Sequence, residues 1–199
     1  MGNCFVLYMK KIALTGGIAA GKTTVMNFFS SQGVATIDSD AIVSLLYKKP
    51  FVKRFLQRHF SSIEKKKIAR IVFSDAKKRA LLEKFLHPLV FEIIESRIKK
   101  FERAKKKLVI IDIPLLFDLE VEKKFSHLFG KTILVKATQP QQVYRLQKKG
   151  YCAADAFARI HAQARFAKSI KRHDFIIDNS RSLQETKKQV KKILAKLKK

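Results

Sequence analysis

Five short apolar runs are spaced along the chain, and longer stretches with helical periodicity separate them. The runs occupy residues 12–14, 34–37, 108–111, 132–135 and 175–177. Each run is almost wholly apolar, which is typical of strands that are covered on both faces. Because helical stretches alternate with these strands, the pattern predicts an α/β fold with a parallel five-stranded sheet, helices on both sides and right-handed crossovers.

The interval between the second and third runs is too long for one helix. Residues 41–106 are predicted to form several helices, which Pro50 and Pro88 divide, and Ser74 with Asp75 predicts a helix start. Helical spacing relates the apolar residues Phe85, Leu86, Leu89, Val90, Ile93, Ile94 and Ile98. We therefore expect a helical lobe that is inserted into the sheet domain.

Two more helices are expected near the end of the chain. Residues 153–171 are rich in Arg, Lys and Ala and precede the last apolar run. Residues 182–199 carry lysines on most sides and a narrow apolar face made of Val190, Ile193, Leu194 and Leu197. A face this narrow favours docking on the sheet over anchoring in a membrane.

The composition is strongly basic, with 43 Lys and Arg against 16 Asp and Glu and a net charge of +27. Such a charge attracts nucleic acid, nucleotides, CoA-like molecules and anionic membranes. The lysines are spread along the chain, however, which favours a generally solvated basic surface over a dedicated patch.

Cysteine usage and the lack of long apolar runs indicate the compartment. Cys4 and Cys152 have no partner at metal-ligand spacing, which favours a reducing, cytoplasmic environment. No apolar run approaches the roughly 20 residues that span a bilayer. Residues 1–8 lack the features of a secretory signal, and we assign them no role.

The strongest chemical signal follows the first apolar run. Residues 16–23 read G-G-I-A-A-G-K-T, which matches G-x-x-x-x-G-K-[ST] in full, with a strand before it and an apolar helix after it. Glycines allow a tight turn whose N–H groups point at a phosphate, and the helix start adds its positive end. The fold class is then a P-loop NTPase three-layer sandwich, and the residues expected to hold ATP are Gly16, Ala19, Ala20, Gly21, Lys22, Thr23 and Thr24.

Each polar side chain of the loop has an expected part in phosphoryl transfer. Lys22 is expected to reach the β- and γ-phosphates and to act in catalysis, and the Thr23 hydroxyl is expected to bind Mg²⁺. Thr24 follows in the same helical turn and is a candidate for an α-phosphate oxygen.

Carboxylates follow the second and third runs, where ligands of open α/β sheets bind. A kinase needs a group that accepts the proton of the attacking hydroxyl, and we favour Asp40 for this part. Asp38 either lines the same crevice or caps the next helix. Asp112 resembles a Walker B carboxylate that assists Mg²⁺ binding, although a plain turn residue is nearly as good an interpretation.

Basic residues after the fourth run suggest a lid over residues 145–172. Arg145 and Arg159 lie in this stretch, and arginines on a closing helix offset the charge that develops during transfer. We expect Arg145 to act in catalysis and to bind ATP. A solvated basic face is the alternative interpretation. After the last run, the polar turn with Asn179 is a candidate contact for adenine.

Several motifs occur in one order along residues 9–197. They are L-T-G-G-I-x-x-G-K-T-T (14–24), I-D-S-D (37–40), V-F-S-D (72–75), L-H-P-L-V (86–90), D-I-P-L-L-F (112–117), R-I-x-x-Q (159–163) and F-I-I-D-N (175–179). In this order and spacing the chain resembles the dephospho-CoA kinase family from end to end.

The resemblance implies an activity and its residues. That family transfers the γ-phosphate of ATP to the ribose 3′-hydroxyl of dephospho-CoA, which gives CoA and ADP in the last step of CoA synthesis. By resemblance, Asp40 is the base, Arg145 and Arg159 belong to the lid, and Mg²⁺ accompanies ATP. The acceptor side would be lined by Asp38, Asp40, His87, Pro88, Leu115 and Arg159.

The resemblance also implies how the chain is organised. A single domain over residues 1–199 would comprise a nucleotide-binding core (9–40 and 107–199), a helical acceptor-binding lobe (41–106) and the lid within the core. We expect a cytoplasmic enzyme with a small-molecule acceptor, no specific nucleic acid, no membrane, and a monomeric or weakly homo-oligomeric state.

The chain departs from the resembled pattern at several positions. Ser44 stands where Arg is common, Lys149 and Gly150 replace Arg-Asp, and Ser169 replaces a basic residue. Lysine cannot replace arginine in bidentate contacts with phosphate. These departures therefore bear on the affinity for the acceptor and on the chemistry of the lid.

Two other functions fit parts of the sequence. One is a nucleoside or other metabolite kinase on the same scaffold. The other is a nucleotide-regulated RNA-binding protein that uses the basic charge, although no RNA-recognition signature occurs in the sequence.

Overall fold

The computed structural model describes residues 9–113, 128–167 and 173–198, with the backbone alone for 164–167. The expected site residue Leu115, the departure at Ser169 and residues 1–8 lie outside this description. The chain divides into two compact units. We call Met1–Ile37 with Phe101–Lys199 the core unit, and Asp38–Lys100 the helical unit.

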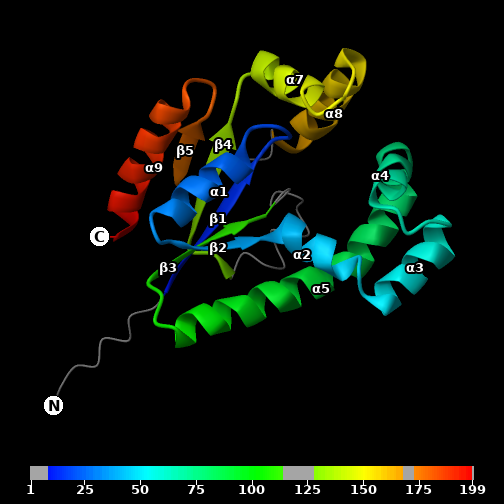
Figure 1. The fold of residues 1–199 in the computed structure, drawn as a ribbon, viewed down its shortest axis with the longest axis horizontal. Helices are drawn as coiled ribbons and strands as arrows, with labels where there is room; N and C mark the ends of the chain where they lie inside the picture. The colour runs from blue at the N-terminus through cyan, green and yellow to red at the C-terminus, as the bar shows by residue number, and fades with distance from the viewer. Residues whose placement is uncertain (1–8, 114–127, 168–172, 199) are drawn as a thin grey trace. The chain divides into compact units, whose positions relative to one another are not determined.

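The core unit is built on a five-stranded sheet with the order β2-β3-β1-β4-β5 (Figure 1). Strand β1 pairs in parallel with β3 and with β4, and β4 pairs in parallel with β5. The predicted parallel five-stranded α/β sheet is confirmed. The strands are β1 (Lys10–Gly16), β2 (Ala35–Asp38), β3 (Leu108–Asp112), β4 (Lys131–Lys136) and β5 (Phe175–Asp178).

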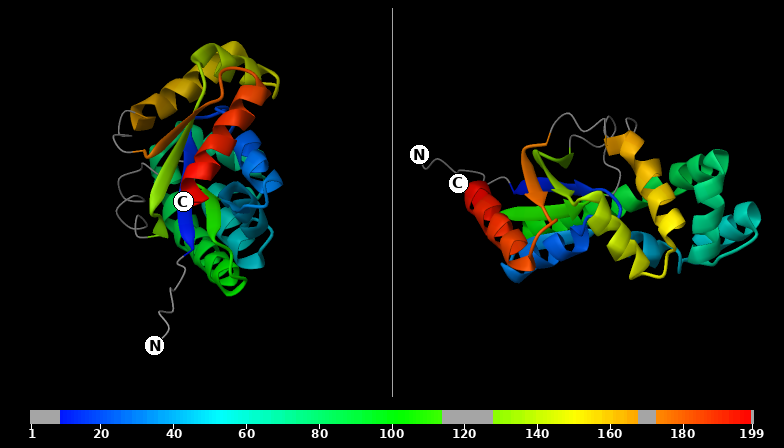
Figure 2. Two further views of the ribbon diagram at one scale, coloured as in Figure 1. Left: turned by 90° about the vertical axis from the view of Figure 1, so that its left-hand side faces the viewer. Right: turned by 90° about the horizontal axis from the view of Figure 1, so that it is seen from above.

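Helices α1 (Lys22–Ser31) and α9 (Leu183–Lys198) lie side by side on the sheet (Figure 2). Their apolar residues join one buried cluster with the strands, so the predicted docking of the last helix is confirmed. Burial of each large aliphatic side chain stabilises the fold by about 1.5–3 kcal/mol, far more than helix propensity contributes. The four expected residues are all buried: Val190, Ile193, Leu194 and Leu197.

Two helices follow β4 in the core unit, α7 (Gln139–Gln147) and α8 (Ala153–Ala167). Leu146, Ala156 and Ile160 form a small buried cluster between them. The side chain of Ile18, from the turn after β1, packs against this cluster. The helix predicted over 153–171 is thus confirmed as far as Ala167.

The helical unit contains α2 (Ser39–Leu46), α3 (Pro50–Phe60), α4 (Lys65–Ser74) and most of α5 (Ala76–Arg103). Pro50 occupies the first turn of α3, where a backbone N–H would have no intrahelical partner, so proline costs no hydrogen bond there. Asp75 accepts hydrogen bonds from the backbone N–H groups of Lys77 (2.8 Å) and Lys78 (2.9 Å), so it caps the start of α5 as predicted.

The expectation that Pro88 divides two helices is wrong. Pro88 lies inside α5, which runs for 28 residues without a break. Proline removes one helix hydrogen bond, yet buried residues on both sides of it hold the helix in place. The packing residues include Leu82, Leu86, Val90, Phe91 and Ile94.

Within the described ranges, no helix has both the length and the apolar content that crossing a bilayer requires.

Candidate functional site

The phosphate loop, residues 16–23, leaves β1 and enters α1. Ala19 (φ 55°) and Gly21 (φ 96°) both adopt left-handed conformations. A Cβ at Gly21 would overlap the side-chain amide of Asn179, and a Cβ at Gly16 would overlap the carbonyl of Val135. The loop therefore depends on glycine at these two positions, and the left-handed Ala19 is the kind of backbone strain that clusters at functional sites.

The first turn of α1 supplies the donors for an anion. Its N-cap residue is Gly21, which has no side chain to cap the exposed N–H groups. The Lys22 ammonium donates to the carbonyl of Gly16 at 3.1 Å, so it lies across the loop and keeps further N–H donors for another acceptor. Thr23 is exposed in the same turn. These donors and the positive helix end suit a phosphate group.

Arg145 and Asn179 bind the carbonyl groups of the second half of the loop. The Arg145 guanidinium donates to the carbonyls of Ala19 and Ala20, both at 3.1 Å, and to the carbonyl of Asn179 at 2.7 Å. The Asn179 amide donates to the carbonyl of Ala20 at 2.8 Å, and its own oxygen accepts from Thr186 at 2.9 Å. Both residues, which the sequence assigned to the nucleotide, therefore bind the backbone of the phosphate loop.

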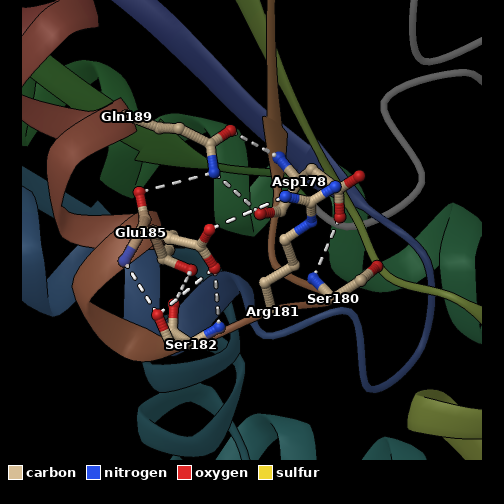
Figure 3. A network of polar contacts seen from close by, with 7 residues as sticks. Asp178, Ser180, Arg181, Ser182, Glu185 and Gln189 are labelled. Carbon is tan, nitrogen blue, oxygen red and sulfur yellow. Dashed lines mark hydrogen bonds and ion pairs between the residues drawn. The ribbon is translucent and has the colours of Figure 1, made fainter.

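Figure 3 shows the polar contacts of the turn after β5, in which Asp178 and Ser180 flank Asn179 in sequence. Gln189 pairs with Asp178 twice, because its oxygen accepts from the Asp178 N–H and its amide donates to the Asp178 carbonyl, each at 2.9 Å. The Asp178 carboxylate accepts from the Ser180 N–H at 2.9 Å. Hydrogen bonding to Ser180, aided by Lys136 at 3.6 Å, lowers the pKa of Asp178.

Two glutamines bind the backbone of the loop at Ile18. Gln163 accepts from the Ile18 N–H at 2.6 Å, and Gln142 donates to the Ile18 carbonyl at 2.7 Å. Sequence reasoning assigned neither glutamine a role, although Gln163 ends the R-I-x-x-Q motif. A cavity of about 280 Å³ adjoins this point, lined in part by Gly17, Ile18, Lys136, Gln142, Gln163 and His173.

Asp112 ends β3 close to the start of the loop. It pairs in register with Leu14 of β1 and is only 5% exposed. Together with the Thr23 hydroxyl it offers an oxygen-only donor set, which is the chemistry that Mg²⁺ prefers. Because the part of the chain that the structure describes has no cluster of three or more His, Cys, Asp or Glu residues, Mg²⁺ here would take its remaining ligands from phosphate and water.

In the helical unit, the two acidic residues of the I-D-S-D motif differ in what they contact. Asp38 accepts from the Ala41 N–H at 2.9 Å and so caps α2, which is one of the two interpretations left open. Asp40 lies in the first turn of α2, where its side chain is exposed. Ser44 donates to the Asp40 carbonyl at 2.8 Å and accepts from the Lys65 ammonium at 3.1 Å. A lysine from α4 therefore lies beside the position where the resembled family commonly carries Arg.

The remaining expected residues are spread over both units. His87 is partly buried on α5, and the adjacent Pro88 is exposed. Arg159 lies on α8 in the core unit, with its guanidinium 4.5 Å from the ring centre of Tyr151. Lys149 and Gly150 form the turn after α7, where Gly150 is left-handed (φ 87°).

The chain is similar in sequence to several known proteins. The profile of a family described as dephospho-CoA kinase matches residues 10–185. The dephospho-CoA kinase of Bacillus licheniformis is 34% identical over 193 residues, which cover 92% of this chain and 94% of that protein. The dephospho-CoA kinase of Helicobacter pylori is 35% identical over 194 residues, covering 94% and 96%.

Solved structures show the same architecture. A protein named TT1252 from Thermus thermophilus has a TM-score of 0.77 at 28% identity and covers 96% of this chain and 98% of its own. A shikimate kinase from Bacteroides thetaiotaomicron has a TM-score of 0.56 at 20% identity, covering 96% and 100%. The second likeness concerns the fold alone, and the predicted P-loop α/β fold class is confirmed.

Proposed function

The chain belongs to the dephospho-CoA kinase family, and from this premise we propose how its residues carry out ATP-dependent phosphorylation of dephospho-CoA. The γ-phosphate of ATP passes to an acceptor hydroxyl, which gives CoA and ADP in CoA biosynthesis. The observation that carries this conclusion is a complete phosphate loop inside a family match that extends from residue 10 to residue 185.

The phosphate loop binds the triphosphate of ATP. Its N–H groups and the positive end of α1 bind the phosphates, while Lys22 neutralises charge on the β- and γ-phosphates. Arg145 and Asn179 hold the loop backbone in its shape, because they donate to the carbonyl oxygens of Ala19 and Ala20. In this proposal both residues support ATP binding through the loop in addition to any direct contact with the nucleotide.

Thr23 and Asp112 hold Mg²⁺. When bound, the ion neutralises charge on the β- and γ-phosphate oxygens. The support for this assignment is the oxygen-only donor set in the core unit and the place of Asp112 beside β1.

Asp40 accepts the proton of the attacking 3′-hydroxyl. As the ribose oxygen bonds to the γ-phosphorus, the O–H bond breaks toward the Asp40 carboxylate and the bond from the γ-phosphorus to the β-phosphate oxygen breaks to release ADP. The exposure of Asp40 supports this role, and so does the cap that occupies Asp38. His87, Pro88, Leu115 and Arg159 are proposed to bind the acceptor on the strength of the family resemblance.

The proposal extends to the setting of the reaction. We place the protein in the cytoplasm as a monomer or weak homo-oligomer that acts on a small-molecule acceptor. The core unit and the helical unit would serve the nucleotide and the acceptor respectively.

A panel of acceptors tests the proposal. Purified protein with ATP and Mg²⁺ is assayed for ADP release with dephospho-CoA, adenosine, common nucleosides and shikimate, and the product is identified by mass. We expect a kcat/KM for dephospho-CoA that exceeds every other acceptor by orders of magnitude. Faster turnover of a nucleoside would indicate a different metabolite kinase, and tight, salt-dependent RNA binding without turnover would favour the RNA-binding alternative.

A further inference from the structure

We infer that Gln142 and Gln163 are positioning residues that tie the phosphate loop to α7 and α8 through the backbone of Ile18. The inference rests on the proposed function, because it concerns the loop that binds ATP. Gln163 accepts from the Ile18 N–H at 2.6 Å, and Gln142 donates to the Ile18 carbonyl at 2.7 Å. We call this pair of contacts the glutamine clamp.

The chemistry of the clamp follows from its backbone partners. An N–H group only donates and a carbonyl only accepts, so Gln163 must present its oxygen and Gln142 its NH₂ group. The two glutamines therefore have opposite parts, and neither can be exchanged for the other. Neither side chain titrates, so the clamp transfers no proton and acts through position alone.

Ile18 is held at three points by the same two helices. Besides the two peptide groups, its side chain packs against the buried cluster of Leu146, Ala156 and Ile160. The contact partners lie 124 and 145 residues away in sequence, so no local turn preference produces this arrangement. The partly buried loop residue Ile18 thus packs against both α7 and α8.

The clamp links the shape of the loop to the position of the helices. Its two peptide groups immediately precede the left-handed Ala19, whose carbonyl is bound by Arg145 of α7. Any displacement of α7 and α8 must either carry this half of the loop along or break these bonds. The conformation of the loop and the position of the two helices are therefore coupled, so that a change in one changes the other.

Hydrogen exchange of the Ile18 amide tests the clamp directly. In nucleotide-free protein, NMR-detected exchange at Ile18 is compared between wild type, Gln163→Met, Gln163→Glu and Gln142→Met. We expect at least tenfold faster exchange in Gln163→Met, and near-wild-type exchange in Gln163→Glu, because the carboxylate still accepts. Gln142→Met should leave the amide protected. Unchanged exchange in Gln163→Met would overturn the inference.

Kinetics test the consequence for ATP. Gln142→Met and Gln163→Met should each lower kcat/KM for ATP about tenfold while melting temperatures stay near wild type, whereas Gln147→Met, on the exposed side of α7, should not. If both clamp variants keep wild-type kcat/KM, the positioning role is refuted. Exchange at β1 and β3 amides reports folding, and Gln163→Asn, which is too short to keep the bond, repeats the test if Gln163→Met does not fold.

The two measurements separate this inference from the proposed function. Amide exchange needs no acceptor, so it tests the clamp even if dephospho-CoA is not turned over. Failure of the acceptor assay with a protected Ile18 amide would refute the activity and leave the clamp intact.

Discussion

The phosphate loop and the acidic turn after β2 both follow the carboxyl end of a strand, yet they are held in different ways. Peptide groups at Ile18, Ala19 and Ala20 are bound by side chains 124 to 159 residues away in sequence. At the acidic turn, the contacts of Asp38 and Asp40 reach three and four residues along the chain.

This difference matches two requirements of the proposed reaction, the binding of ATP phosphates by the loop and the acceptance of a proton by Asp40. The loop backbone is held by side chains of other elements, so its N–H groups need little rearrangement to bind phosphate. Asp40 is exposed, and the hydrogen bond described for it is accepted by its backbone carbonyl and not by its carboxylate. Changes in the loop should therefore impair ATP binding and transfer together, whereas a change at Asp40 should impair transfer alone.

Replacement of Lys22 should have the largest effect. We expect Lys22→Ala to lower kcat/KM for ATP about 10³-fold or more, because the variant loses the cation that offsets charge on the transferred phosphate. The fold should survive, since the ammonium contacts only the Gly16 carbonyl among the hydrogen bonds described. The coupled ADP-release assay measures the loss, and Lys192→Ala on the exposed side of α9 is the matched control. A loss below tenfold would contradict the role of Lys22.

The Asp40→Asn variant tests the acidic turn after β2. We expect kcat to fall about 10²-fold or more, because asparagine cannot accept the hydroxyl proton. The affinity for ATP should stay within about twofold of wild type, since the loop is unchanged. Steady-state kinetics with both substrates measure these values, and Glu92→Gln on α5 is the control for loss of a carboxylate. If only the KM for dephospho-CoA changes, Asp40 is a binding residue instead.

The fold was predictable from sequence because each strand is a short apolar run, and the two central runs, in β1 and β3, are buried over consecutive residues. Buried runs such as 108–111 carry a continuous apolar signal, and the narrow apolar face of residues 182–199 leaves docking as the main way to bury it. Pro88 shows the limit of local rules. Its effect on α5 is decided by tertiary contacts of its neighbours, which a single sequence does not display.

The site was predictable to the extent that its signal is local. The loop motif, with its glycines and Lys22, occupies eight consecutive residues and requires no knowledge of the fold. The contacts that hold the loop come from two distant helices, α7 and α8, and from the turn after β5, where Thr186 of α9 binds Asn179. Gln142 and Thr186 therefore have no sequence signal of their own. Arg145 and Asn179 were noticed as polar residues near a nucleotide, but their bonds to the loop carbonyls became visible only in the structure.

Replacement of two left-handed glycines, one in the phosphate loop and one outside it, should have effects of intermediate size. Gly21 and Gly33 are both left-handed, but a Cβ at Gly21 meets the Asn179 amide, whereas a Cβ at Gly33 meets nothing within 4 Å. Gly33→Ala should cost only the backbone strain, about 1–2 kcal/mol of unfolding free energy. Gly21→Ala should cost that amount and also weaken ATP binding about tenfold or more, because Asn179 must move away from the loop.

Denaturant unfolding and ATP titration of both variants measure these two effects. Equal ATP affinities in Gly21→Ala and Gly33→Ala would show that the contact between Asn179 and the loop is unimportant for binding.

Asp178 gives the smallest expected effect, on the turn that holds Asn179. Hydrogen bonding to Ser180 lowers the pKa of Asp178 below its ordinary value of 3.8. A carboxyl whose pKa is lower in the folded state than in the unfolded state stabilises the fold above about pH 4, and this contribution is lost as the pH falls through the folded-state pKa. The side chain is 42% exposed, so solvent screening keeps the effect small. Melting temperatures of wild type and Asp178→Asn should therefore differ slightly at pH 7 and converge toward pH 3. A gap that widens in acid would mean that the turn around Asn179 does not depend on this charge, which would leave its contacts with Thr186 and Gln189 as its support.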